Sequence, residues 1–208
     1  MEYKLKQRFS VGISASSAAQ TVSLDRIPKF LTIITQGYAC SIFIEFRDVL
    51  NGRVTITELE NFHYLNDFHL KKAIPVNIQD TTYVAIVGTG TRKEKGVYGV
   101  LQITRLTSEA MLKTIAFAVV RTDLKESELE CCRGFVDQLS NGDIFFCFSE
   151  EKEIFVLEYS DIFLAIEGIG IGEIEYRKMD LQFKVLSMKT GTHNGNYGIF
   201  GIVYYEAG

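Results

Sequence analysis

The clearest local structural signal in the sequence is the run Asp48-Val49-Leu50-Asn51-Gly52-Arg53-Val54-Thr55-Ile56. Asn51-Gly52 supplies the positive φ angles that a type I′ turn needs, and β-rich sequence flanks it on both sides. The run therefore predicts a β-hairpin and points to a chain built from short strands joined by tight turns.

On the N-terminal side of this hairpin, residues 3–15 alternate apolar and polar side chains, with Gln7 as the one exception. At about 3.3 Å per residue such a strand would reach roughly 40 Å, twice the usual length. Residues 1–15 therefore predict an extended N-terminal strand, or an arm that reaches beyond a compact monomer.

Apolar and β-branched runs bounded by turn residues predict most of the other strands. These runs lie at residues 30–34, 39–46, 83–87, 97–104, 112–121, 143–148, 153–159, 163–167, 173–176, 179–187 and 197–205. Ile174 and Tyr176 share one alternation phase, whereas Met179 and the apolar residues after it share the other. This change of phase at Arg177-Lys178 predicts a bulge or a tight bend.

One segment departs from the β pattern, because its apolar residues fall largely on one helical face. These residues are Leu124, Leu129, Cys132, Phe135, Val136 and Leu139. Asp123 followed by Glu126 imitates a capping box, and Asn141-Gly142 provides a suitable stop. We therefore predict one amphipathic α-helix of about four turns over residues 123–140, covering a sheet face or an open end.

Composition favours a single globular unit. The chain has 208 residues, of which 47% are hydrophobic and 23% charged, so a sizeable core is available. Only Pro28 and Pro75 interrupt the strand patterns, and no linker or repeat divides the sequence. We predict one β-rich domain spanning residues 1–208, a mainly β fold in the form of a two-sheet β-sandwich or barrel-like domain with about a dozen strands.

The charge balance argues against nucleic acid as a partner. Twenty-two basic residues stand against 26 acidic ones, a formal net charge of −4, which is the wrong sign for neutralising phosphates. Apolar runs such as residues 115–120 are far shorter than the roughly 20 residues of a membrane span, and the N-terminus lacks the apolar block of a secretory signal. We expect a soluble protein that is not exported by a signal peptide and that lies in the cytoplasm or in an assembled particle.

The four cysteines are Cys40, Cys131, Cys132 and Cys147. No C-x-x-C spacing occurs, which excludes the usual zinc-ribbon and thioredoxin patterns, and vicinal cysteines pair with each other only in a strained ring. We interpret all four as reduced and mostly buried thiols.

Two glycine-rich runs resemble cofactor loops only superficially. Neither Gly88-Thr89-Gly90 nor Gly168-Ile169-Gly170-Ile171-Gly172 has glycine or alanine at the third position of the dinucleotide fingerprint. The first run predicts a hairpin tip. The second predicts a coiled strand or a close approach of another backbone, which would be an interface if that backbone belonged to a second subunit.

Candidates for chemistry are few. His63, Asp67 and His69 would lie on one face of an extended chain, but they would share a metal ion only if the chain folds back at Asn66-Asp67. The sequence has no G-x-S-x-G nucleophile motif. Tyr204 and Tyr205, with Phe200 and Tyr197, are candidates for a sugar-stacking platform, although aromatic residues in a terminal strand more often belong to a core. We therefore predict no catalytic, cofactor-binding or metal-binding residue.

These features favour a non-enzymatic, self-assembling structural protein. The long N-terminal strand and the protruding hairpins suit a homo-oligomeric assembly that contains other structural proteins, for instance a virion component of a capsid, tail or ring. This hypothesis rests on analogy of fold. The alternatives are a small-molecule or carbohydrate-binding β module and an enzyme assembled from scattered side chains.

Overall fold

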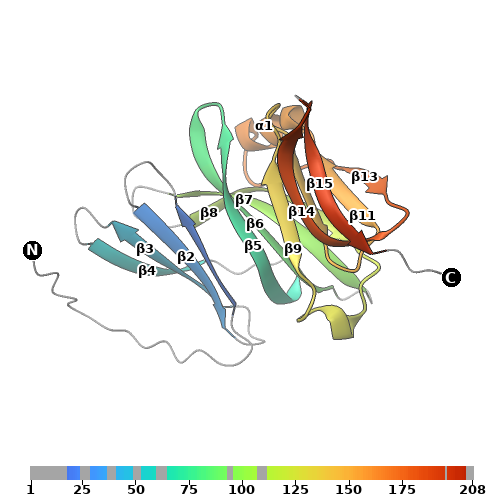
Figure 1. The fold of residues 1–208 in the computed structure, drawn as a ribbon. Coiled ribbons are helices and arrows are strands. Elements are labelled where there is room, and N and C mark those ends of the chain that lie inside the picture. The colour runs from blue at the N-terminus through green and yellow to red at the C-terminus, as the bar shows by residue number, and fades with distance from the viewer. Residues whose placement is uncertain are drawn as a thin grey trace, which may run out of the picture.

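The computed structural model describes residues 18–23, 29–36, 41–48, 53–59, 65–92, 96–106, 112–194 and 196–204. Across these residues fifteen strands form four sheets, accompanied by one α-helix (Figure 1). The sheets are stacked and do not close into a barrel. The predicted mainly β, sandwich-like fold is confirmed, with two more sheets than a simple sandwich has.

The N-terminal sheet is an antiparallel meander in the order β1-β2-β3-β4. Its strands are β1 (Ala18–Ser23), β2 (Lys29–Gln36), β3 (Ser41–Asp48) and β4 (Arg53–Leu59). Asp48 pairs with Arg53 across β3 and β4, which confirms the hairpin predicted around Asn51-Gly52. The turn residues 49–52 and the predicted N-terminal arm, residues 1–15, lie outside the described residues.

The central sheet has the order β12-β8-β7-β6-β5. Its strands are β5 (Asn66–Ile78), β6 (Thr81–Thr91), β7 (Val97–Leu106), β8 (Leu112–Arg121) and β12 (Gly172–Glu173), and only β12 pairs in parallel. Residues 83–90 of β6 are all buried, which is typical of a strand covered on both faces. Figure 1 shows the N-terminal sheet beside the central sheet, away from the strands that follow β8.

The facing sheet packs on the central sheet and has the order β13-β11-β10-β9. Its strands are β9 (Gly134–Gln138), β10 (Ile144–Phe148), β11 (Glu153–Leu157) and β13 (Arg177–Asp180). The core between the two sheets contains Phe146, whose ring stacks on that of Phe155 with the ring centroids 5.2 Å apart. A Cβ atom on Gly99 would come within 2.4 Å of the Phe148 ring, so glycine on β7 makes room for that side chain.

The outer hairpin forms a further layer on the opposite face of the facing sheet. It consists of β14 (Lys184–His193) and β15 (Asn196–Tyr204), which pair with a bulge near Leu186. Val185 of β14 is buried in a second core with Phe145, Cys147, Ile154 and Val156 of the facing sheet. All five residues of β10 are therefore buried, with alternate side chains in the two cores.

The helix predicted over residues 123–140 is wrong. This stretch forms a single 3₁₀ turn, η1 (Glu126–Glu128), followed by β9. Its apolar residues do reach a core, but Val136 and Phe135 point to opposite faces of a strand. The expected stop at Asn141-Gly142 is the turn of the β9–β10 hairpin, in which Gly142 has a φ of +95°.

The α-helix of the described residues is α1 (Tyr159–Glu167), where residues 163–167 were predicted as a strand. The Asp143 carboxylate accepts a hydrogen bond from the Tyr159 N–H at 2.8 Å, which satisfies one free donor of the first turn. Ile162 is fully buried in the main core. After α1 the chain crosses from the central sheet at β12 to the facing sheet at β13, which explains the change of phase at Arg177-Lys178.

Candidate functional site

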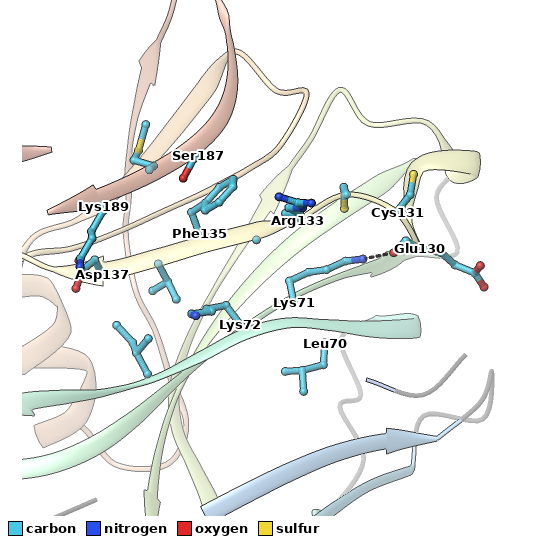
Figure 2. A pocket seen from close by; sticks show the side chains of 15 residues that line it. Leu70, Lys71, Lys72, Glu130, Cys131, Arg133, Phe135, Asp137, Ser187 and Lys189 are labelled. Atoms are coloured by element: carbon cyan, nitrogen blue, oxygen red, sulfur yellow. Dashed lines mark hydrogen bonds between the residues drawn. The ribbon is translucent and has the colours of Figure 1, made fainter. Parts of the chain in front are cut away.

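An open groove of about 750 Å³ lies where the edges of three sheets meet. Its walls are residues 70–72 and 74 of β5, residues 130–137 leading into and along β9, and residues 187–189 of β14. Figure 2 shows side chains from all three elements around it. The groove therefore joins segments that lie far apart in the sequence.

The groove exists because β5 and β9 approach closely without pairing as one sheet. A Cβ atom on Gly134 would come within 2.4 Å of the Cβ atom of Lys71, so only glycine allows this approach. At one end the Gln138 amide accepts a hydrogen bond from the Asn77 N–H at 2.9 Å and donates one to the Asn77 carbonyl at 2.8 Å. These contacts fix the distance between the two strands.

Lys71 fastens the other end of the β5–β9 contact. Its Nζ donates to the carbonyl oxygens of Leu129 and Glu130, the latter at 3.2 Å (Figure 2). These carbonyls follow η1 and have no partner in a helical ladder, so a cation stabilises them. The side chain of Lys71 is thus committed to structure, although its charge still contributes to the field of the groove.

Asp137 anchors the outer hairpin to β9. Its Oδ2 accepts hydrogen bonds from the Thr190 N–H at 3.1 Å and from the Thr190 hydroxyl at 2.5 Å, and its Oδ1 accepts one from the Gln138 N–H at 3.0 Å. Both carboxylate oxygens are therefore engaged. Hydrogen bonds to an ionised carboxylate are stronger than those between neutral groups.

Three further cations line the groove and have exposed side chains: Lys72, Arg133 and Lys189. None of them forms an ion pair with a carboxylate of the described residues. With Lys71 they give four positive charges against the two carboxylates of Glu130 and Asp137. The groove is thus locally basic in a chain whose formal net charge is −4.

The backbone of Arg133 is held in place from the facing sheet. Its N–H donates to the Ser149 hydroxyl at 2.7 Å, and its carbonyl accepts from the Ser149 N–H at 2.8 Å. Ser149 is itself buried. This reciprocal pair fixes the point from which the guanidinium extends.

The thiols of the described residues are all free. Burial raises the pKa of Cys132, and it raises that of Cys147 to about 12. Cys131 is exposed at the rim of the groove. The prediction of mostly buried thiols holds for Cys132 and Cys147, and Cys40 lies outside the described residues.

A buried carboxyl lies outside the groove, in the turn between β10 and β11. Glu151 exposes 3% of its surface, and its Oε1 has no hydrogen-bond partner among the described residues. Burial, reinforced by the charges of Glu153 and Asp123, raises the pKa of Glu151 to about 7. Protonation therefore favours the folded state at this position.

The glycine runs have structural roles. Gly88 and Gly90 lie inside β6 and not at a hairpin tip, and a Cβ atom on Gly88 would come within 2.2 Å of the Phe68 ring. Gly172 meets the backbone of Ala165 in α1, where an added Cβ atom would be 2.4 Å from the carbonyl oxygen. The close backbone approach predicted for this run is confirmed, and here the approaching backbone belongs to the same chain.

The remaining candidates are not brought together by the described residues. His69 lies in β5, whereas His63 and the side chain of Asp67 fall outside the description, so their metal site stays a prediction. Within the described part of the chain no three metal-ligating side chains cluster. Tyr197 and Tyr204 belong to β15, and their side chains are also outside the description.

Sequence reasoning missed the groove. Its cations lie in β5, beside β9 and in β14, more than 50 residues apart from one segment to the next. The adjacent pair Lys71-Lys72 is the only local signal.

Comparison with protein-family models, curated proteins and solved structures gives no match to this chain. No helix in the described segments is long and apolar enough to cross a membrane.

Proposed function

We propose that this protein is a non-enzymatic structural subunit that assembles with copies of itself. The observation that carries the proposal is a patch of exposed apolar side chains on the outer hairpin. The patch consists of Leu186, Phe200 and Ile202. We refer to it as the hairpin patch.

The apolar side chains of the hairpin patch are not needed for packing the hairpin on the facing sheet. Phe200 and Ile202 lie two residues apart on β15, so they share one face, and 43% and 66% of their surfaces are exposed. Val185, Met188 and Ile199 of the same hairpin already pack against the facing sheet. Contiguous exposed apolar side chains of this kind mark interaction surfaces more often than isolated ones do.

β15 also offers backbone groups for assembly. Among the described strands β14 is its only pairing partner, which leaves one edge of the hairpin without a neighbouring strand. An uncovered edge strand is a template for pairing with another chain. A neighbouring copy seated on β15 would cover Phe200 and Ile202, and a heterologous contact of this kind closes into a ring or extends into a filament.

The first test is the molar mass of the full chain in solution, measured by light scattering over a range of concentrations. We expect a mass several times 23.5 kDa, or growth into long particles. Ile202→Ser should reduce that mass. Ile169→Ser is the matched control, because Ile169 is fully exposed in the loop after α1 and lies outside the hairpin patch.

A concentration-independent monomer of the unaltered chain would overturn the proposal. So would equal effects of the two isoleucine substitutions. Within this proposal the assembly is a capsid, tail or ring of a virion and includes other structural proteins, and electron microscopy of the assembled material should then show closed rings, shells or tubes.

A second function, binding of a small molecule, is favoured by the basic groove. A volume of about 750 Å³ falls within the range of small-molecule sites in proteins, and apolar and polar groups both line it. This function does not compete with assembly, because a subunit that forms an assembly can also carry a ligand.

A further inference from the structure

We propose that the groove between β5, β9 and β14 binds a small molecule that carries two or more negative charges, as phosphate or carboxylate groups, and an apolar part. The inference rests on the groove alone and does not depend on self-assembly. Lys72, Arg133 and Lys189 would contact the charged groups.

Lys72, Arg133 and Lys189 line one groove from three separate elements of the fold. Elsewhere in the described residues, Lys178 of β13 lies 2.6 Å from Glu153, Arg177 of β13 lies 2.8 Å from Glu158, and Lys184 of β14 approaches Glu150 at 3.8 Å. The three groove cations have no such carboxylate among the described residues. Their positive charges therefore remain available to an anion from outside the chain.

Asp137, one of the two carboxylates that line the groove, already holds a fixed position. Asp137 accepts hydrogen bonds from Thr190 and Gln138 on both of its oxygens. Its orientation is thus set by the contact between β9 and β14. A carboxylate held in this way is poorly placed to move toward Lys72 or Arg133.

The residues that line the groove indicate the chemistry and size of its ligand. A guanidinium binds carboxylate and phosphate through two parallel hydrogen bonds, and lysine contributes a mobile point charge. Partly buried Ile74, Phe135 and Met188 line the same groove and suit an apolar group. A formal charge of −4 over the whole chain opposes a long polyanion, which favours a small molecule.

Binding can be tested by calorimetric titration of the full chain at low salt with ATP, pyrophosphate and citrate. The three probes separate phosphate from carboxylate and show whether an apolar group adds affinity. We expect at least one probe to bind with a Kd below about 1 mM, and we expect added salt to weaken binding.

Substitutions locate the site. Lys72→Ala, Arg133→Ala and Lys189→Ala should each weaken binding by about tenfold, as expected for the loss of one charged hydrogen bond. Lys113→Ala is the matched control, because Lys113 is an exposed lysine on β8, outside the groove. Equal weakening by the control, or binding of none of the three probes, would overturn the proposal.

A second readout uses the exposed thiol at the rim of the groove. Cys131 should react with iodoacetamide, and a bound anion should slow that reaction several-fold, which peptide mapping by mass spectrometry assigns to Cys131. Arg133→Ala should raise the probe concentration that gives half-maximal protection by about tenfold. Unchanged alkylation at saturating concentrations of all three probes would contradict binding in this groove.

Discussion

Strands β10 and β15 are both rich in apolar residues, yet their surroundings are opposite. All five residues of β10, from Ile144 to Phe148, are buried between the central sheet and the outer hairpin. On β15 the side chains of Phe200 and Ile202 are exposed. Apolar sequence in β10 is explained by the fold, whereas that in β15 exceeds what the fold needs and is available to another molecule.

The largest expected effect is on the β10 side of this comparison. Phe146→Ala removes a fully buried ring that stacks on Phe155, and we expect a loss of about 3–5 kcal/mol in the free energy of unfolding. Phe200→Ala removes the same side chain from the exposed strand and should cost less than about 1 kcal/mol. Urea denaturation of dilute protein measures both, and similar losses would remove the distinction.

A pH dependence should arise from the turn that follows β10. Glu151 has an ordinary pKa of 4.5 and a folded-state pKa of about 7, so the folded state binds the proton more tightly than the unfolded chain does. The stabilisation of the folded state by protonated Glu151 is complete below pH 4.5 and is lost as the pH rises through 7. By linkage the folded state should lose about 3 kcal/mol over this interval.

Glu151→Gln should remove that slope, because the amide has no proton to lose in this range. Glu150→Gln, at the exposed neighbouring position, is the control and should leave the slope unchanged. Free energies of unfolding measured between pH 4.5 and 8 would show the difference. A free energy of unfolding that rises with pH in the unaltered chain would contradict the assignment. So would a slope that is the same in the unaltered chain and in Glu151→Gln.

The strands that the sequence predicted best are those whose apolar pattern is not interrupted by a bulge. Residues 83–87 and 144–148 are continuous apolar runs, and both lie in central strands. Strand β5 was missed because bulges at Asn66–His69 and Leu70–Lys72 change its phase. Pro75 also argued against a strand, but β5 is an edge strand, where proline is tolerated.

The helix was misplaced because short apolar runs do not distinguish the two periods. Leu124, Leu129 and Cys132 have the spacing of a helical face, yet they reach the core from an irregular turn. Residues 163–167 read equally well as a strand. Asn141-Gly142 had the hairpin signal of Asn51-Gly52, and the two dipeptides deserved the same interpretation.

The basic groove was beyond sequence reasoning for a different reason. Its geometry depends on the close approach of Gly134 to Lys71 and on the hydrogen bond from the Thr190 hydroxyl to Asp137. Both contacts join segments that are distant in the chain, so no local period or motif encodes them. The apolar residues of β15 were visible in the sequence, but their exposure was not.

An intermediate effect is expected where the outer hairpin is attached. Asp137→Asn weakens the charged hydrogen bonds to the Thr190 N–H and hydroxyl, and we expect a loss of about 1–2 kcal/mol. Amide hydrogen exchange should accelerate in β14 while β6 and β10 keep their protection. Asp143→Asn is the control, because Asp143 accepts a hydrogen bond from the Tyr159 N–H. It should accelerate exchange in α1 and not in β14. Uniform acceleration over all strands would mean that the hairpin is not a separately attached layer.

Ile202→Ser should have the smallest effect on the stability of the fold. It also tests most directly whether the exposed apolar residues of β15 serve association. Its side chain is 66% exposed, so at low protein concentration the free energy of unfolding should change by less than about 0.5 kcal/mol. Association of folded copies stabilises them by mass action, so the Tm of an assembling protein rises with its concentration. We expect that rise for the unaltered chain and for Ile169→Ser, and a flat Tm for Ile202→Ser. If the Tm of the unaltered chain is flat as well, the apolar surplus of β15 does not serve self-association.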